Sequence, residues 1–115
     1  MSAFRFTILT PEATAFDGQV DSIMVPGQGG CFGIMARHEP LIGAVATGIL
    51  KFLKEREEIF FIVGEGIVEV HGGEATLLTD AAIRAANLGE AEDRLEKYLK
   101  TQAKPPASLR TSASR

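Results

Sequence analysis

The chain is poor in several residue types, and each shortage excludes a class of protein. It has one cysteine and no tryptophan. One cysteine cannot form an intramolecular disulfide, so the fold does not depend on an oxidising compartment. Its 12 lysines and arginines are outnumbered by 15 aspartates and glutamates, which gives a formal net charge of −3 at pH 7. Binding to nucleic acid or to anionic lipid requires a basic surface, so we expect no nucleic-acid partner.

The sequence also lacks long apolar runs. No run approaches the ~20 apolar residues of a membrane-spanning helix. The first residues lead into a strand-like pattern instead of the apolar stretch of a signal peptide. We therefore expect no direct membrane insertion and a reducing, cytoplasmic compartment. The 115 residues, 45% of them hydrophobic, are enough for one domain with a real core.

Short strand-like segments fill most of the chain. Residues 4–9 alternate between apolar and polar, and residues 59–63 form a continuous apolar run typical of a strand buried on both faces. Gly72 and Gly73 separate two strand patterns and predict a tight hairpin, whereas Asp17 and Gly18 predict a turn after a short strand. Short strands with glycine turns predict a β-sandwich or barrel. The expected strands are residues 4–9, 15–18, 20–25, 41–45, 49–54, 59–63, 67–71, 74–78 and 79–84.

The pattern changes near residue 87. Asn87 followed by Glu90 has the spacing of a helix-capping box, and the apolar residues then recur at helical intervals. We therefore expect a β-sandwich domain over residues 1–86, a C-terminal helix over 87–104 and a flexible tail over 105–115. The apolar stripe of this helix must rest on the sandwich or on a partner. The stripe consists of Leu88, Ala91, Leu95 and Tyr98.

The stretch from Pro26 to Leu41 holds four glycines, two prolines, the only cysteine and one of two histidines. Such a density predicts a shaped loop. It is no phosphate-binding loop, because no lysine follows the glycines and strands flank them. Cys31 and His38 could form a nucleophilic pair, but nothing in the sequence supplies an orienting third group or activates the thiol. His38 and His71 lie far apart without metal-ligand spacing, so no metal site is expected.

Taken alone, the residues predict a β-sandwich with one helix that serves as a protein-interaction module, with a thiol enzyme using Cys31 as the less favoured alternative. The order of the motifs, however, resembles the epsilon subunit of F-type ATP synthases over about residues 4–99. The matching motifs are Thr10-Pro11-Glu12, Phe16-x-Gly18, Val25-Pro26-Gly27, Gly30-x-Phe32-Gly33-Ile34, His38-x-Pro40-Leu41, Gly48-Ile49-Leu50, Gly66-x-x-Glu69-Val70 and Leu77-x-Thr79-Asp80-x-Ala82-x-Arg84.

This resemblance implies a ten-stranded β-sandwich followed by helical structure. It also implies a non-catalytic subunit of the central stalk, without cofactor, that binds the gamma subunit and the c-ring and couples ion-driven rotation to ATP synthesis or hydrolysis. The location would be peripheral, on the cytoplasmic face of the bacterial inner membrane, and the ion could be a proton or sodium. The implied contact loop at the ring-facing end contains Gly29, Gly30, Cys31, Phe32, Gly33, His38, Pro40 and Leu41. The implied partner face of the helix contains Leu88, Ala91, Leu95 and Tyr98.

The chain departs from the family pattern in two places, as a divergent copy with a shortened C-terminal region would. Family members often carry acidic residues where this chain has Gly29 and Cys31, which suggests a correspondingly altered loop on its ring partner. Members that bind ATP share an Ile/Leu-Asp-x-x-Arg-Ala motif, and residues 88–93 lack both its aspartate and its arginine. We therefore expect no ATP binding by this chain.

Overall fold

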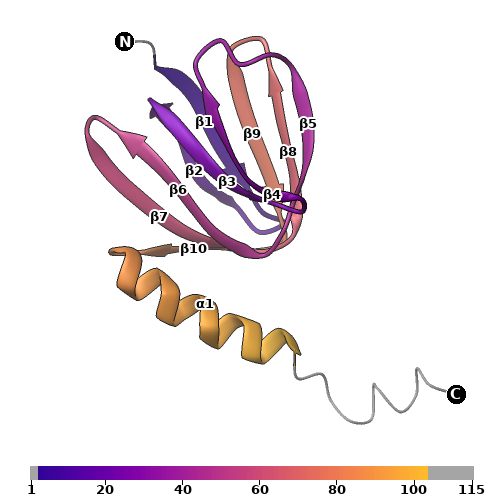
Figure 1. The fold of residues 1–115 in the computed structure, drawn as a ribbon, viewed down its shortest axis with the longest axis vertical. Coiled ribbons are helices and arrows are strands. Elements are labelled where there is room, and N and C mark those ends of the chain that lie inside the picture. Colours follow the sequence, from indigo (N-terminus) through magenta and orange to yellow (C-terminus); the bar gives the residue numbers. More distant parts are fainter. Residues whose placement is uncertain (1–2, 104–115) are drawn as a thin grey trace, which may run out of the picture.

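The structure, a computed structural model, describes residues 3–103. Ten strands curl around a common interior, and one helix lies beneath them (Figure 1). This architecture confirms the expected ten-stranded sandwich with a C-terminal helix, while the expected tail lies outside the described residues. The strands are β1 (Phe4–Leu9), β2 (Thr14–Val20), β3 (Ser22–Gly27), β4 (Gly30–Met35), β5 (Leu41–Val45), β6 (Gly48–Lys54), β7 (Glu57–Val63), β8 (Gly66–His71), β9 (Glu74–Thr79) and β10 (Ala82–Ala85), and the helix is α1 (Leu88–Ala103).

The strands form two layers of five. The first layer has the order β4-β3-β6-β7-β10, and the second has the order β5-β8-β9-β1-β2. The layers share hydrogen bonds at one point, where Gly27 at the end of β3 pairs with Val45 at the end of β5. All pairings are antiparallel except β1 with β9, which is parallel.

Aromatic rings join the two layers through the interior. Phe6 of β1 and Phe52 of β6 are fully buried, and their ring centroids lie 5.3 Å apart in an edge-to-face arrangement. Phe52 also stacks on Phe61 at 5.9 Å and contacts Phe16 at 4.6 Å. Each such pair contributes about 0.5–1.5 kcal/mol beyond the burial of its area. The alternation seen in residues 4–9 therefore directs one face of β1 into this core.

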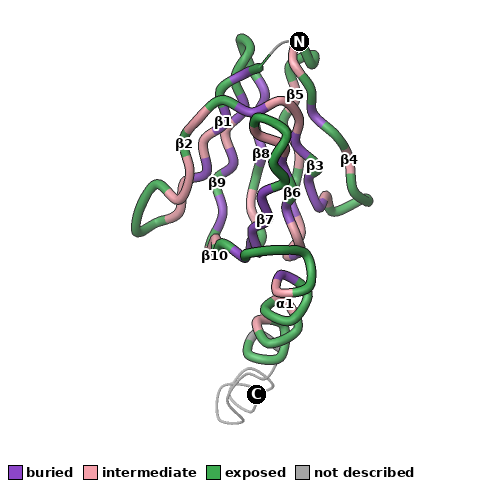
Figure 2. Tube along the Cα trace, turned by 90° about the vertical axis from the view of Figure 1, so that its left-hand side faces the viewer, coloured by how far each residue is buried: buried purple, intermediate pink, exposed green. Residues whose placement is uncertain are grey.

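The helix packs on the outer side of the first layer. Phe60 and Ile62 of β7 point away from the main core and form a second buried cluster with Ala85 and Ala91. Because the other side of β7 faces the main core, this strand is buried on both faces, as its continuous apolar run predicts. On α1, the buried and half-buried positions gather on one side (Figure 2).

Two turn predictions have opposite outcomes. Gly72 and Gly73 have φ angles of 61° and 80°, so the predicted tight hairpin between β8 and β9 is confirmed. The predicted turn at Asp17 and Gly18 is wrong, because both residues lie inside β2 and pair with β1. The full ladder between β1 and β2 outweighs the local turn preference of an Asp-Gly pair.

The predicted loop between Pro26 and Leu41 is also wrong over residues 30–35, which form β4. This strand pairs with β3 in a hairpin, with Val25 opposite Phe32 and Ile23 opposite Ile34. Ile34 is fully buried, so a two-residue alternation is present among the glycines. β4 supplies the tenth strand, in a place where the residues themselves predicted none.

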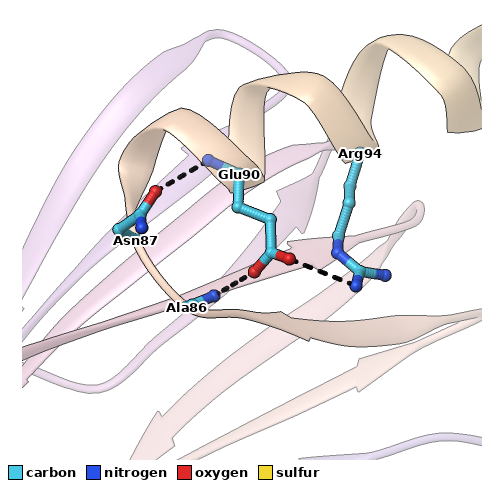
Figure 3. A network of polar contacts seen from close by, with 4 residues as sticks. All are labelled: Ala86, Asn87, Glu90 and Arg94. Atoms are coloured by element: carbon cyan, nitrogen blue, oxygen red, sulfur yellow. Dashed lines mark hydrogen bonds and ion pairs between the residues drawn. The ribbon is translucent and has the colours of Figure 1, made fainter.

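The N-terminus of α1 is closed by three side chains (Figure 3). The Glu90 N–H donates to Asn87 Oδ1 at 2.8 Å, and the Ala86 N–H donates to Glu90 Oε1. Arg94 Nη2 donates to Glu90 Oε2 at 3.3 Å. The predicted cap at Asn87 is therefore confirmed, whereas the returning bond of Glu90 goes to the N–H of Ala86, one residue before the cap residue that a standard capping box would use. The backbone hydrogen bond from Ala86, followed by the interaction with Arg94, holds the pKa of the Glu90 carboxyl below its ordinary value of 4.5.

The first prediction concerns Gly66. A Cβ at this position would lie 1.9 Å from the carbonyl oxygen of Leu78 in the neighbouring strand, and backbone cannot move aside cheaply. We expect Gly66→Ala to lower the free energy of unfolding by about 3 kcal/mol. Gly29→Ala is the matched control, because nothing lies within 4 Å of its Cβ position. Urea unfolding of both variants measures the difference, and equal stabilities would contradict this account of Gly66.

The second prediction concerns Glu90 and pH. A carboxyl whose pKa is lower in the folded state stabilises that state above its unfolded pKa and loses this effect as pH falls through its folded pKa. We therefore expect the first turn of α1 to lose protection against amide hydrogen exchange as the pH drops below about 4.5. Glu90→Gln should weaken the turn at neutral pH and remove its share of the pH dependence. A pH profile identical to that of the unsubstituted chain would contradict the role of this carboxylate.

Candidate interaction surfaces

The tip of the β3–β4 hairpin is an uncharged surface. Gln28 and Gly29 connect the two strands, and the Gln28 N–H donates to the Ala44 carbonyl at 3.0 Å. Open space surrounds the Cβ positions of Gly29 and Gly30. Gly30 has a φ of 125°, which disfavours other residues, whereas Gly29 has no positive φ. The fold itself therefore gives a reason for glycine at position 30 but not at position 29.

Phe32 fixes this tip to the sandwich. A Cβ at Gly27 would lie 2.8 Å from its ring, and a Cβ at Gly43 would lie 3.3 Å from it. The half-buried ring thus fills the space between the two glycines, where β3 and β5 meet. Of the predicted contact residues on β4, Cys31 and Gly33 are exposed, while Phe32 holds the hairpin in place.

His38 and Pro40 lie at the other end of β4. The His38 N–H donates to the Met35 carbonyl at 3.1 Å, and Nδ1 lies 2.7 Å from the Glu39 carbonyl, to which it can donate. Since β4 extends from Gly30 to Met35, about 17 Å of strand separates the two groups. The expectation of one continuous contact loop is therefore wrong in this respect: its predicted residues lie at opposite ends of the sandwich.

The same separation bears on the thiol chemistry considered for Cys31. The cysteine is free and exposed on β4, and four residue steps of extended strand lead from it to Met35 before His38 is reached. A thiol and an imidazole must lie within hydrogen-bond reach to act as a nucleophilic pair. The structure does not bring Cys31 and His38 together.

The outer face of the second layer carries an apolar row that the sequence motifs did not identify. Ile67 pairs with Ala44 on one side and Leu78 on the other, and Leu78 pairs with Leu9. Ile67 is 49% exposed and Leu78 is 47% exposed. Beside them lies a shallow hollow of about 370 Å³. The signal was in the sequence: isoleucine and leucine occupy outward positions of β8 and β9, where polar residues are usual.

The remainder of this outer face is polar. Arg5 binds Asp17 through two hydrogen bonds, of 3.0 and 2.9 Å, and these lower the pKa of the Asp17 carboxyl. Ile42 is the exception, with 71% of its surface exposed. It borders a second hollow of about 360 Å³ that includes Pro40 and Leu41. Large exposed apolar side chains on one face are typical of a protein-contact surface.

Most of the predicted partner face of α1 is covered by the chain itself. Ala91 is fully buried, and Leu95 and Tyr98 pack against the second buried cluster. The Tyr98 hydroxyl lies 3.0 Å from the position that a Cβ of Gly64 would occupy. Leu88, in contrast, is 48% exposed. The sequence left open whether this stripe packs on the sandwich or on a partner. In the structure, most of it packs on the sandwich.

Two general properties complete the description of residues 3–103. No group of three or more potential metal-ligating side chains occurs within this part of the chain. No helix within it has the length and hydrophobicity needed to cross a membrane.

Comparisons with known proteins agree with this architecture. Residues 3–85 match the family described as ATP synthase, Delta/Epsilon chain, beta-sandwich domain. The ATP synthase epsilon chain of Bordetella avium (strain 197N) is 35% identical over 117 residues, which cover 100% of this chain and 79% of that protein. That of Bordetella parapertussis is 39% identical over 93 residues, which cover 79% of this chain and 66% of the relative. The chain thus spans about two thirds to four fifths of the length of these relatives.

Solved structures share the fold at low sequence identity. A chain in the cryo-EM structure of the Euglena gracilis mitochondrial ATP synthase, OSCP/F1/c-ring, superposes with a TM-score of 0.70 at 18% identity, covering 99% of this chain and 74% of that one. A chain of the Tetrahymena thermophila mitochondrial ATP synthase central stalk/c-ring gives 0.61 at 17% identity, covering 88% and 96%. With the family match over most of its length, the chain belongs to the ATP synthase delta/epsilon family.

Proposed function

We propose that this chain is the epsilon subunit of a rotary F-type ATP synthase and acts as a non-catalytic part of its central stalk. In this role it binds the gamma subunit and the c-ring, and couples ion-driven rotation to ATP synthesis or hydrolysis. The observation that carries the proposal is the exposed apolar row on the second layer, in a chain of this family. The names of the relatives and the assemblies that contain the two structural neighbours support it.

The outer face of the second layer is the proposed gamma surface. Ile42, Ile67 and Leu78 expose large apolar side chains there. Burying such side chains against a partner contributes about 25 cal/mol per Å² of apolar area. Pro40 and Leu41 border the hollow beside Ile42, so we assign the predicted contacts at these two residues to this surface.

The tip of the β3–β4 hairpin is the proposed ring surface. Gly29, Gly30 and Cys31 are exposed there and carry no charge. Since no internal contact requires glycine at position 29, close approach of a partner to the backbone is the remaining physical reason for it. Such a contact would depend on shape and on uncharged hydrogen bonds, and little on ionic strength.

Rigidity links the two proposed surfaces. The hairpin tip is tied to β5 by hydrogen bonds on either side of Gly27, including the Ala46 N–H to the Pro26 carbonyl at 2.8 Å. β5 then pairs with β8, which carries Ile67. A displacement of the tip by a rotating ring would therefore be carried through strands to the gamma surface. This proposed coupling needs no chemistry within the chain, and the location would be peripheral, at the cytoplasmic face of the bacterial inner membrane.

The third prediction tests gamma binding. Ile67→Glu places a charge in the centre of the apolar row, and we expect it to weaken co-purification with the gamma subunit at least 30-fold, as loss of a binding hot spot does. Ile83→Glu is the matched control, because Ile83 is 37% exposed on β10 of the other layer. Pull-down of gamma by each variant, with circular dichroism to verify folding, measures the effect. Equal binding by a folded Ile67→Glu variant would overturn the proposed surface.

The fourth prediction tests the ring contact. Gly29→Leu adds a bulky side chain in open space, so the unfolding free energy should change by no more than about 0.5 kcal/mol. We expect the affinity for the c-ring to fall about 10-fold, which corresponds to a loss of about 1.4 kcal/mol of contact energy. The assembled enzyme should therefore keep its ATP hydrolysis while its ATP-driven ion pumping falls. Gln19→Leu, an exposed substitution on β2, is the control. Normal pumping by the Gly29→Leu enzyme would contradict a ring contact at this tip.

A further inference from the structure

The exposed apolar row of the second layer is bordered by carboxylates along β8. Side chains of a strand alternate between its two faces, so Glu65, Ile67 and Glu69 point outward together. All three are exposed. Glu65 and Ile67 line the same hollow, of about 370 Å³. An acidic side chain thus lies on each side of Ile67 in the direction of the strand.

The neighbouring strand β9 has a similar pattern. Leu78 pairs with Ile67, and Asp80, which follows the strand, lines the same hollow. Toward the other end of the two strands, Glu69 and Glu74 line a polar hollow of about 290 Å³. Carboxylates therefore border the pair of Ile67 and Leu78 toward both ends of these strands.

Little positive charge offsets this border. The five strands of the second layer contain one lysine or arginine, Arg5, and it binds Asp17 at 2.9 Å. Arg5 also lies opposite Glu74 in the pairing of β1 with β9, so it offsets part of that charge. His71 is the one further ionisable side chain on these strands. Within residues 3–103, three border carboxylates take part in no ion pair, those of Glu65, Glu69 and Asp80.

The other layer and the helix have balanced charge. The strands of the first layer carry three basic and two acidic side chains, and α1 carries three basic and four acidic ones. Some of these charges are paired directly, as Lys51 is with Glu58 at 3.4 Å. The excess of negative charge among the strands therefore coincides with the exposed apolar row.

This coincidence indicates the chemistry of the partner. A protein interface has an apolar centre and a polar rim that remains in contact with water. Rim charges change the affinity little, but complementary charges steer the encounter and orient the partner. Here Ile67 and Leu78 form the centre and the carboxylates form the rim. The complementary surface therefore has apolar side chains bordered by lysine or arginine.

A second copy of this chain does not supply such a surface. A two-fold contact through this face would place the face against itself. The carboxylates of Glu65, Glu69 and Asp80 would then meet the same carboxylates of the other copy, and juxtaposed like charges disfavour a contact. The balanced charge of the first layer and α1 offers no basic counterpart either. A different protein is therefore the better occupant.

We propose that the outer face of the second layer binds a protein surface in which apolar side chains are bordered by lysine or arginine, and that Glu65, Glu69 and Asp80 steer its association. This inference rests on the proposed function, which makes the gamma subunit the partner, and it adds the charge that gamma carries there. Attraction across the rim weakens with salt, because charges are screened over about 10 Å at about 0.1 M and about 3 Å at about 1 M. In this respect the face differs from the uncharged hairpin tip.

The experiment measures association of the full chain with the gamma subunit by surface plasmon resonance, at about 0.05 M and about 1 M sodium chloride. Glu65→Lys/Glu69→Lys reverses the charge on both sides of Ile67. We expect its association rate constant to fall about 10-fold at low salt and less than about 3-fold at high salt. Glu57→Lys/Glu92→Lys is the matched control, with the same change in net charge at exposed positions of β7 and α1. Its association rate constant should stay within about 3-fold of that of the unsubstituted chain.

Three results would overturn the proposal, provided that circular dichroism shows the variants folded. One is an unchanged association rate of Glu65→Lys/Glu69→Lys at low salt. Another is an equal loss in the control, because total charge and not the border would then matter. The third is faster association of Glu65→Lys/Glu69→Lys. That result would assign the face to residues 104–115 of this chain, which contain three basic and no acidic side chains.

Failure of the proposed function gives a different result. If gamma does not bind the unsubstituted chain at either salt concentration, the gamma contact itself is refuted, and this inference with it. If gamma binds the unsubstituted chain at the same rate at both salt concentrations, the gamma contact stands and the acidic border has no role in it.

Discussion

The two-sided burial of β7 is the constraint on which the rest of the structure depends. Phe61 and Val63 point into the main core, while Phe60 and Ile62 point out and would be exposed without α1. Fully burying each such side chain is worth about 1.5–3 kcal/mol. The helix is therefore held by the strand that also anchors the aromatic core, and the capping residues at Asn87 and Glu90 only set where it begins. Sandwich and helix form one packed unit, so the apolar stripe of α1 is already occupied.

Because the apolar stripe of α1 is buried on the sandwich, it is not available to partners. Only the apolar side chains that remain exposed elsewhere can contact another protein. Among the described residues, the exposed large apolar side chains lie mainly on two faces, the outer face of the second layer around Ile67 and the outer face of the first layer, which α1 covers in part. The first lies on an otherwise polar face, which also carries the ion pair of Arg5 and Asp17. The second continues a face that the chain has half covered itself. One rigid sandwich can thus offer separate contacts in different directions, with the uncharged hairpin tip as a third.

Much of the fold could be predicted from the sequence, because its signals are local and repeated. The alternation in β1, the continuous run of β7, the Gly72-Gly73 turn and the capping box each arise from a few neighbouring residues. The failures have a common physical cause, which is pairing with a distant strand. Gly18 lies inside β2 because it pairs with Phe6 of β1. β4 forms because Phe32 and Ile34 pair with residues of β3. The exposed apolar row could not be recognised before the strands were paired across the layer.

The stretch from Pro26 to Leu41 shows why composition alone was misleading. Its glycines look alike in the sequence, but the structure requires them for different reasons. Gly27 leaves room for the ring of Phe32, and Gly30 adopts a positive φ, whereas no contact within the chain requires glycine at position 29. A glycine required by the fold and one that only a partner would require cannot be distinguished until the surrounding atoms are known. For this reason the strongest case for a contact at the hairpin tip is the empty space around Gly29, more than the number of glycines there.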